Sequence, residues 1–376
     1  MRKILSFLVL LFSVYGLFSQ SASESSWAIR PGLRIWGLSL EVGYTSALFF
    51  DENPTEIALG VSSAYQTEGY FRKIDGTYIS ETDFTSDNRI SDTTEYSQFN
   101  FISYLGLRQS LGNNFWIDGF YRLWYNFNFL DDLEASHILV QTTLPDKQRS
   151  LSHSFLLALR YAGTKVRPVS TLVDGFTATL SGEVAPGALN PIGEASYLRG
   201  TLELEAFLPL YENIQEDTQM NSFSLGLNFM SITDFTKGLD ESIAYDGVPT
   251  HARQKFGGLV TRGGLGGTVR GFEDGRFDGS FKNAQSIELR MMLPTLFVPG
   301  LLPLAVVYTD LGFWGLPLDG GSFSSDFGAI GSFGGGIGID LFGFGTLIAY
   351  THYALGEKTL SGGSWTPFGL GFGFHF

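Results

Sequence analysis

Apolar and polar residues alternate along most of this chain, in segments of about ten residues. The alternation is clear in Leu38–Tyr44, Phe115–Phe129, Phe176–Val184, Leu202–Leu208 and Phe223–Phe229. Successive side chains of a β-strand point to opposite faces, so each segment has one apolar face and one polar face. The pattern predicts an all-β protein built from many half-apolar strands.

The last nine residues form another alternating segment. Phe368, Leu370, Phe372, Phe374 and Phe376 occupy one face, and Gly369, Gly371, Gly373 and His375 occupy the other. A terminal strand that ends in Phe is the pattern expected of outer-membrane barrels.

A secreted soluble sandwich would also alternate, so the period alone leaves two readings open. Aromatic residues at segment ends, such as Tyr44, Phe129 and Trp314, favour a membrane barrel, because such barrels carry aromatic girdles at both interfaces. In lipid every backbone donor must be paired, so the strands must close on themselves. We therefore predict a transmembrane antiparallel β-barrel of sixteen strands with a lumen-inserted loop, although twelve strands would also fit the length.

Residues 1–22 have the features of a secretory signal peptide. Arg2 and Lys3 precede the apolar stretch Ile4–Phe18, and the small residues Ser19, Ser21 and Ala22 offer cleavage sites. An apolar core of ~15 residues is short for a membrane-spanning helix. We expect residues 23–376 to form a single outer-membrane barrel domain.

One later segment is apolar enough to suggest a helical span. Met291 to Thr309 carries no charge, but Pro294, Pro299 and Pro303 interrupt it. Each proline removes a backbone donor and breaks a helix interior. The segment therefore predicts a strand, a proline-rich turn and a second strand.

Composition narrows the function classes. Glycine supplies 47 of 376 residues and aromatics 15%, while the formal net charge is −14. An acidic chain of this kind argues against a nucleic-acid-binding surface. With no cysteine there is no disulfide framework, thiolate metal site or cysteine nucleophile.

The last third of the chain changes character and carries a set of short motifs. Val269-Arg270-Gly271-Phe272 follows a glycine-rich run, Glu288 stands in Ile287-Glu288-Leu289-Arg290, and Asp310 stands in Tyr308-Thr309-Asp310-Leu311-Gly312. Glycine-rich strands near 331–341 and 344–355 and the terminal strand complete the order.

This order resembles the C-terminal part of the BamA/TamA superfamily, the outer-membrane barrels for protein assembly and two-partner secretion. That family carries a Val-Arg-Gly-aromatic motif on a loop folded into the lumen between its eleventh and twelfth strands. The resemblance covers roughly residues 254–376 and implies that Arg270 meets two acidic residues, Glu288 and Asp310, inside the barrel.

The residues themselves are compatible with that lumenal lock. Ile287, Leu289 and Met291 share one face, which leaves Glu288 on the opposite, lumenal face if the apolar face meets lipid. The fork of donors on Arg270 suits two carboxylates, and Gly271 would let the loop turn tightly. The alternative is that Arg270 is a solvated loop charge and that the two acids line a wet pore.

The chain departs from the family pattern in two places. Family members usually carry periplasmic POTRA domains before the barrel, whereas here few residues separate the signal peptide from a first strand expected near 28–36. Trp314 also lies one residue closer to Gly312 than the family pattern predicts. We expect a barrel-only relative without POTRA domains.

No catalytic constellation is evident, so we expect neither an enzyme nor a cofactor. The histidines at 137, 153, 251, 352 and 375 show no metal-ligand spacing, and Gly263–Gly267 lacks the Lys-Ser/Thr of a phosphate-binding loop. The histidines are expected at lumen, loop or interface positions.

The resemblance implies assembly, insertion or translocation of outer-membrane proteins through a lateral seam. The seam would lie between the first strand and the glycine-rich terminal strand, because glycine weakens a strand and a weak edge can template a client strand. The partners would be the outer-membrane lipid bilayer and unfolded outer-membrane clients or a separate periplasmic protein. The alternatives are an accessory barrel subunit without insertase activity and a plugged porin.

Overall fold

The computed structural model describes most of the strands and a part of the connections between them. The described residues are 26–34, 37–46, 53–70, 94–215, 220–240, 242, 248–250, 252, 255–256, 269–272, 277–296, 300–315, 328–341, 345–356 and 365–374. The predicted signal peptide, residues 1–22, lies outside them. In this part of the chain no helix is both long and apolar enough to cross a membrane.

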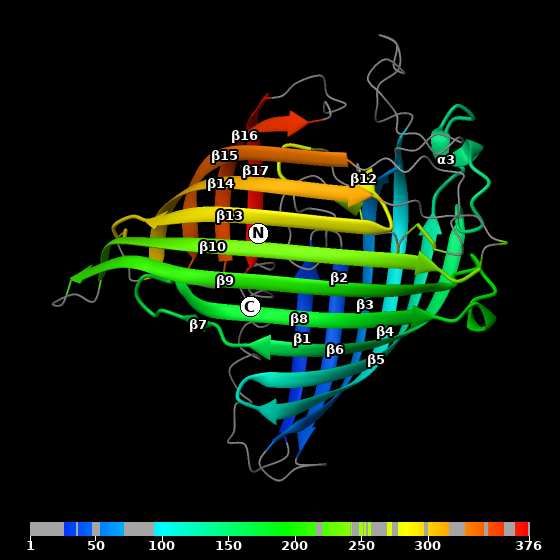
Figure 1. The fold of residues 1–376 in the computed structure, drawn as a ribbon, viewed down its shortest axis with the longest axis horizontal. Coiled ribbons are helices and arrows are strands. Elements are labelled where there is room, and N and C mark those ends of the chain that lie inside the picture. Colours follow the sequence, from blue (N-terminus) through cyan, green and yellow to red (C-terminus); the bar gives the residue numbers. More distant parts are fainter. Residues whose placement is uncertain are drawn as a thin grey trace, which may run out of the picture.

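One antiparallel sheet contains almost all of the secondary structure, which confirms the predicted all-β fold (Figure 1). Its strands are β1 Ser26–Arg34, β2 Gly37–Ser46, β3 Thr55–Gly69, β4 Glu95–Gly112, β5 Phe115–Asn128, β6 Arg149–Ala162, β8 Val173–Ala185, β9 Tyr197–Gln215, β10 Met220–Gly238, β13 Phe281–Met292, β14 Leu301–Gly315, β15 Gly328–Leu341, β16 Gly345–Gly356 and β17 Trp365–Phe374. The smaller elements are α3 Ile138–Gln141, β7 Lys165–Val166, η2 Gly187–Leu189, β11 Lys255–Phe256 and β12 Phe277–Asp278.

Each strand of the main path pairs with its neighbours in chain order, from β1 to β17. The path contains fourteen strands among the described residues, and β7 pairs beside β8. The expected sixteen strands are thus not confirmed. The proline-rich segment contributes to two strands as predicted, because β13 ends at Met292 and β14 begins at Leu301. Part of the connection predicted as a turn, residues 297–299, lies outside the described residues.

The sheet is inverted relative to a soluble protein, with polar residues inside and apolar residues outside. Along β14, Leu304, Tyr308 and Asp310 are buried, whereas Val307 and Leu311 are exposed. Exposed leucines, isoleucines and valines recur at every second position on the other strands, and serine, asparagine and charged residues occupy many of the buried positions between them. This inverted pattern is the one that a membrane-spanning barrel requires.

The connections at the two ends of the strands differ in length. At one end, called the long-loop end, they are 70–94, 129–148, 186–196, 239–280, 316–327 and 357–364, together with the two-residue connection 35–36. At the other end, called the short-loop end, they are 47–54, 113–114, 163–172, 216–219, 293–300 and 342–344. Bacterial outer-membrane barrels have short periplasmic turns and longer extracellular loops.

Aromatic side chains on the outer wall form a belt near the short-loop end. Its members are Trp27, Tyr44, Phe115, Tyr161, Phe176, Tyr211 and Phe223, and ring contacts join Trp27 to Tyr44, Phe115 to Tyr161, Tyr161 to Phe176 and Tyr211 to Phe223. At the long-loop end Phe129 contacts Tyr65 and Phe127. The predicted girdle positions of Tyr44 and Phe129 are confirmed.

Trp314 was expected in the girdle, and that prediction is wrong. Its side chain is buried on the inner face and stacks on Phe277, with ring centroids 4.3 Å apart. Trp314 shares its parity with Tyr308 and Asp310, so the pleat points it into the lumen.

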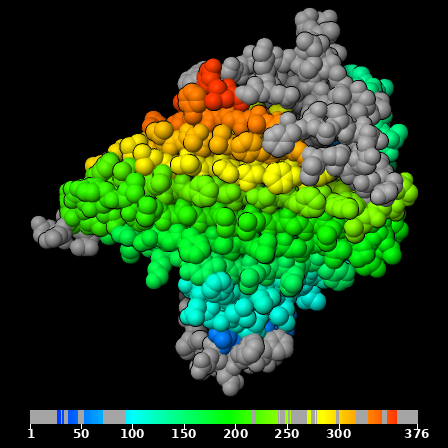
Figure 2. All heavy atoms as spheres, in the orientation of Figure 1, coloured from blue at the N-terminus to red at the C-terminus, as the bar shows by residue number. Residues whose placement is uncertain are grey.

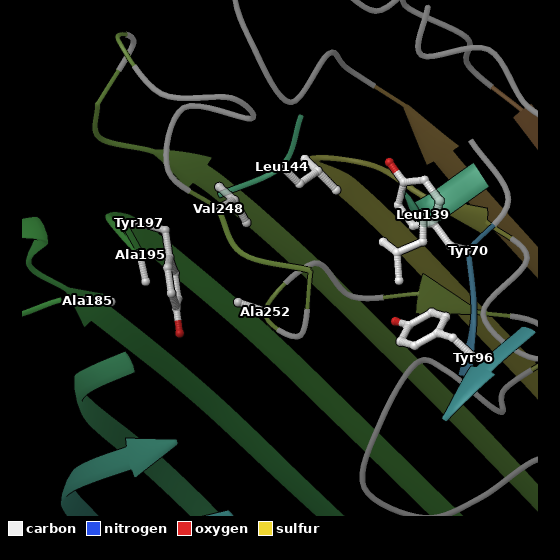
Figure 3. Packing of buried hydrophobic residues seen from close by; sticks show 9 residues of the cluster. All are labelled: Tyr70, Tyr96, Leu139, Leu144, Ala185, Ala195, Tyr197, Val248 and Ala252. Carbon is white, nitrogen blue, oxygen red and sulfur yellow. The ribbon is translucent and has the colours of Figure 1, made fainter. Parts of the chain in front are cut away.

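An apolar cluster joins connections at the long-loop end (Figure 3). Its buried members are Tyr70, Tyr96, Leu139, Leu144, Ala185, Ala195, Tyr197, Val248 and Ala252. The backbone amide of Thr250 also donates to Asp146, at 2.5 Å, which ties connection 239–280 to connection 129–148. The connections therefore pack on one another over this end of the barrel.

Candidate functional site

The site is built on the inner faces of two neighbouring strands, β13 and β14. In their antiparallel register Ser286 is opposite Asp310 and Glu288 is opposite Tyr308. All four side chains are buried, whereas Ile287 between them is 45% exposed on the outer wall. The pleat therefore places two acids and a tyrosine side by side on the lumenal surface.

Arg270, in connection 239–280 between β10 and β13, inserts between these groups. Its Nε and Nη2 donate to the two oxygens of Asp310, at 2.7 and 2.8 Å, and Nη1 donates to Glu288 Oε2 at 2.9 Å. Nη2 also donates to Ser286 Oγ at 3.0 Å, and the backbone amide of Arg270 donates to Asp310 Oδ2 at 3.0 Å. We call this group, with Ser286 and Tyr308, the arginine clamp.

The clamp is almost dry. Arg270 is 2% exposed and Asp310 0%. Burial alone would lower the pKa of the Arg270 guanidinium, but the hydrogen bonds and charge of Asp310, with the charge of Glu288, raise it above its ordinary value. Arg290 forms a second ion pair with Glu288, so two cations face two anions. A buried group of this kind is held only while every member keeps its partner.

Tyr308 supplies the flat surface on which the guanidinium lies. The Arg270 Cζ is 3.2 Å from the centroid of the Tyr308 ring, and the Tyr308 hydroxyl hydrogen-bonds to His352 of β16. Arginine stacks on aromatic faces while its in-plane donors stay free for carboxylates. The ring thus fixes the plane of the clamp.

Gly271 allows the chain to turn directly after Arg270. Its φ is +93°, a conformation that L side chains rarely adopt. A Cβ added there would lie 3.3 Å from the Cβ of His352 and within 4 Å of Ala354 and Ser332. The backbone at Gly271 therefore rests directly on the inner faces of β15 and β16.

The outer residues of the motif pack into an apolar patch of the lumen wall. Val269 and Phe272 are buried in a cluster with Ile232, Phe277, Ala284, Trp314, Ile330 and Ala354. These residues come from β10, β12, β13, β14, β15 and β16. The motif residues Val269, Arg270, Gly271, Phe272, Glu288 and Asp310 are thus gathered in one place, although 40 positions separate Arg270 from Asp310.

The motif lies between β10 and β13, which are the ninth and tenth strands of the main path, rather than between an eleventh and a twelfth. Five strands follow it, as the family order requires.

A second buried ion network was not found from the sequence. Asp234 lies 3.9 Å from the Lys282 ammonium and accepts a hydrogen bond from Arg199 Nε at 2.9 Å. Arg199 also lies 3.7 Å from Glu183. Glu183 forms a further ion pair with Arg122. Lys282 Nζ also donates to the carbonyl of Gly279 at 2.6 Å, at the end of connection 239–280. The sequence feature that could have indicated this network is the presence of charged residues on the polar faces of these strands.

The terminal strand β17 holds most of the predicted seam residues. Gly369, Gly371 and Gly373 are opposite Tyr350, Ile348 and Thr346 of β16, and the register shifts between Tyr350 and His352. Phe368 is also on β17, whereas Phe376 lies outside the described residues. In the described part of the chain β1 and β17 each pair with a single neighbour, so they are the two ends of the sheet path.

Three of the five histidines are described, and each lies where a structural role explains it. His137 caps α3, His153 is on β6 beside Tyr121, and His352 contacts the clamp tyrosine. Among the described residues no group of three metal-ligating side chains could hold an ion. His251 and His375 lie outside the described residues.

The sequence matches no protein-family model and no curated protein. The chain is similar in fold to a number of solved structures, among them two proteins at low identity. BamA from Haemophilus ducreyi lacking POTRA domains 1–3 aligns with a TM-score of 0.53 at 13% identity, over 93% of this chain and 64% of that one. CdiB from Escherichia coli aligns with a TM-score of 0.50 at 13% identity, over 93% of this chain and 55% of that one. The chain thus spans less than two thirds of either protein, and it has the barrel fold found in both.

Proposed function

We propose that this chain, which has the barrel fold of BamA and CdiB, is an outer-membrane protein that assists the insertion or translocation of other outer-membrane proteins. Its location is supported by the apolar outer wall, the aromatic belt and the unequal connections. The long-loop end would face the exterior and the short-loop end the periplasm.

The observation that carries the proposal is the arginine clamp. It holds residues 269–272 of connection 239–280 inside the barrel, against the inner faces of β13 to β16. A passive diffusion porin needs an open aqueous lumen, whereas a buried ion group here fixes chain within it. The geometry therefore favours a protein that acts on a client through the strands of its wall, rather than a pore that lets solutes diffuse through its lumen.

The working part of the wall would be the seam between β1 and β17. The glycines of β17 leave three positions without a side chain to pack, and the register shift at Tyr350 and His352 weakens its ladder to β16. The edge of a strand whose backbone groups are unpaired can form hydrogen bonds with an incoming strand. Opening the seam would expose such an edge to a client within the membrane.

The test is the insertion of an unfolded outer-membrane protein into liposomes, scored by protease protection, with and without this protein. Because the chain has no cysteine, one cysteine in β1 and one in β17 give a unique, reversible cross-link. We expect faster insertion that disappears on oxidation and returns on reduction. The matched control places the same cysteine pair in β5 and β6, which already pair along their length.

Failure to accelerate insertion would reject self-sufficient insertase activity and favour an accessory barrel subunit. A steady open-channel conductance in planar bilayers would instead favour a porin. Acceleration that persists in the oxidised seam variant would remove the seam from the mechanism.

A further inference from the structure

The outer wall of β10 and β13 carries a group of four neighbouring polar residues, whereas most outward positions of the other strands with described side chains are apolar. Ser231 and Thr233 of β10 lie opposite Gln285 and Asn283 of β13. Their parity is the outward one, because Ile232 and Ala284 are buried in the lumenal cluster while Phe235 and Ile287 are exposed. We call these four residues the wall amide patch. The near wall in Figures 1 and 2 is formed by β8, β9, β10, β13 and β14 and includes this region.

Hydrogen bonds link the members of the patch to one another. Asn283 Nδ2 donates to Thr233 Oγ1 at 2.8 Å, and Gln285 Nε2 donates to Asn283 Oδ1 at 3.0 Å. Asn283 Nδ2 also lies 3.5 Å from Ser231 Oγ. In the described part of the chain no donor reaches Gln285 Oε1, so the chain of bonds ends on a carboxamide with an open acceptor.

The patch lies between the two aromatic levels of the wall. On β10, Phe223 belongs to the belt at the short-loop end, and Phe235 is exposed near the long-loop end. Thr233 and Ser231 precede Phe235 by two and four residues, which puts them roughly 5–10 Å below it on a tilted strand. Thr233 therefore faces hydrocarbon rather than water, whereas Ser231 has the same parity but is only 9% exposed.

Hydrocarbon offers no hydrogen-bond partner to an amide. Polar side chains within a membrane are costly and usually face another protein surface, where they join transmembrane segments through hydrogen bonds. A diffuse lipid contact would leave the open acceptor of Gln285 unused. The patch consequently has the chemistry of a contact surface.

We propose that the wall amide patch binds the same patch of a second copy of this chain, which makes the protein a two-fold symmetric dimer in the membrane. A two-fold interface brings each residue near its own counterpart, so it favours groups that are complementary to themselves. A carboxamide is such a group, because it carries a donor and an acceptor side by side. The patch has no charge that would repel its copy.

The surroundings of the patch suit the same contact. Ile287, Val307 and Leu311 are exposed beside it on β13 and β14, so a copy related by the two-fold axis would also cover apolar surface. This inference rests on the proposed membrane location but not on insertase activity. It leaves the seam free, because β10 and β13 lie in the middle of the strand path.

The first test uses Ile287→Cys, the exposed wall position of β13 next to Gln285, in the otherwise cysteine-free full-length protein, oxidised in native outer membranes. We expect a disulfide-linked dimer on non-reducing gels. The matched control is Leu59→Cys on β3, an exposed wall position seven strands away along the path, which should form no disulfide cross-link because it lies outside the proposed interface. Equal cross-linking of the two variants would indicate random collision and would overturn the proposal.

The second test measures the monomer–dimer equilibrium of the protein in lipid bilayers by single-molecule photobleaching. Gln285→Leu should raise the dissociation constant roughly tenfold, because the paired amides are lost, whereas Leu59→Ala should leave it unchanged. Absence of the cross-link in the first test together with a monomeric wild-type protein in the second would overturn the proposal even if insertion is accelerated. A dissociation constant that Gln285→Leu leaves unchanged would show that the interface lies elsewhere, and it would overturn the proposal.

Discussion

At the scale of single residues, Arg270 makes most of the polar contacts between residues 269–272 and the inner wall of the barrel. The Arg270 guanidinium bonds three side chains and stacks on a fourth, and its neighbour Gly271 sits in a conformation that few residues adopt. Polar burial of this kind stabilises one arrangement strongly because every alternative leaves a charge unpaired. Substitutions here should act on the loop before they act on the barrel.

Arg270→Ala should leave the barrel assembled but release the loop. Asp310 would remain buried without its main cation, at a cost of roughly 3–5 kcal/mol. Limited proteolysis should then cut within residues 259–283 faster than it does in the parent protein. Arg167→Ala is the control, because that arginine is far more exposed, at 41%, and its ion pairs are worth only about 0–1 kcal/mol. Unchanged protease sensitivity of Arg270→Ala would contradict the clamp.

Gly271→Ala should destabilise the loop by about 1–3 kcal/mol, because alanine must either strain its backbone or displace His352. Gly182→Ala on β8 is the control, since an added Cβ there meets nothing within 4 Å. Urea titration of the lipid-reconstituted proteins compares them. Equal midpoints would show that the left-handed turn is not required.

His137, in connection 129–148, should make the long-loop end sensitive to acid. Burial lowers its pKa below the ordinary 6.5, and its Nδ1 accepts the Leu139 amide as the cap of α3. The folded state resists protonation, so this stability is complete above pH 6.5 and is lost as pH falls below that value. The protection factors of the amides of residues 138–142, corrected for the pH dependence of intrinsic exchange, should fall between pH 7.5 and 5. A similar loss of protection on acidification in His137→Gln would assign the effect to another group.

At the scale of elements, connection 239–280 is held at two levels. The clamp fixes residues 269–272 against β13 and β14, and Lys282 fixes Gly279 near the long-loop end beside Asp234. The amide of Thr236 also donates to Ser280 at 2.7 Å. The two attachments use different strands, so they should release separately.

Lys282→Met should loosen the outer attachment and leave the clamp closed. It removes the donor to Gly279 and one cation beside Asp234, a loss of about 1–3 kcal/mol. Hydrogen exchange should quicken at Thr236 while the Arg270 amide stays protected. Lys165→Met on β7, an exposed lysine, serves as the control. Simultaneous exposure of both amides would show that the loop moves as one unit.

The positions of many strands could be predicted from the sequence, but their lengths and total number could not. Period two was strong in β2, β5, β8 and β10, because one face of each meets hydrocarbon. The predicted Leu202–Leu208 is only the middle of β9, which extends to Tyr197–Gln215. Strand ends outside the hydrocarbon lose the alternation, so neither lengths nor the total count followed from it.

The site was partly predictable for a related reason. Parity alone placed Glu288 and Asp310 on the polar face, and the family resemblance supplied Arg270. The network of Lys282, Asp234 and Arg199 depends on the registers of three strands, which no local pattern encodes. Trp314 was misplaced because its position near a segment end outweighed its parity.

At the scale of the whole molecule, the inverted distribution of polarity predicts opposite responses to charge on the two faces. Leu180 on β8 is 58% exposed on the outer wall, four residues from the belt residue Phe176. Leu180→Arg should destabilise the folded protein in bilayers by about 2–4 kcal/mol. Thr179→Arg, on the lumenal face, should cost less. Equal losses, measured by urea titration in lipid vesicles, would contradict the assignment of the faces.

The stack of Trp314 on Phe277 gives the molecule an optical reporter of its own. The indole belongs to the wall and the phenyl ring to the connection, and both are buried. If the loop leaves the lumen, water reaches the indole and its emission shifts to longer wavelength. The difference between the spectra of the parent protein and Trp314→Phe isolates this signal from the other five tryptophans. Loop movement during a single encounter with a client would then be visible in real time, without any attached dye.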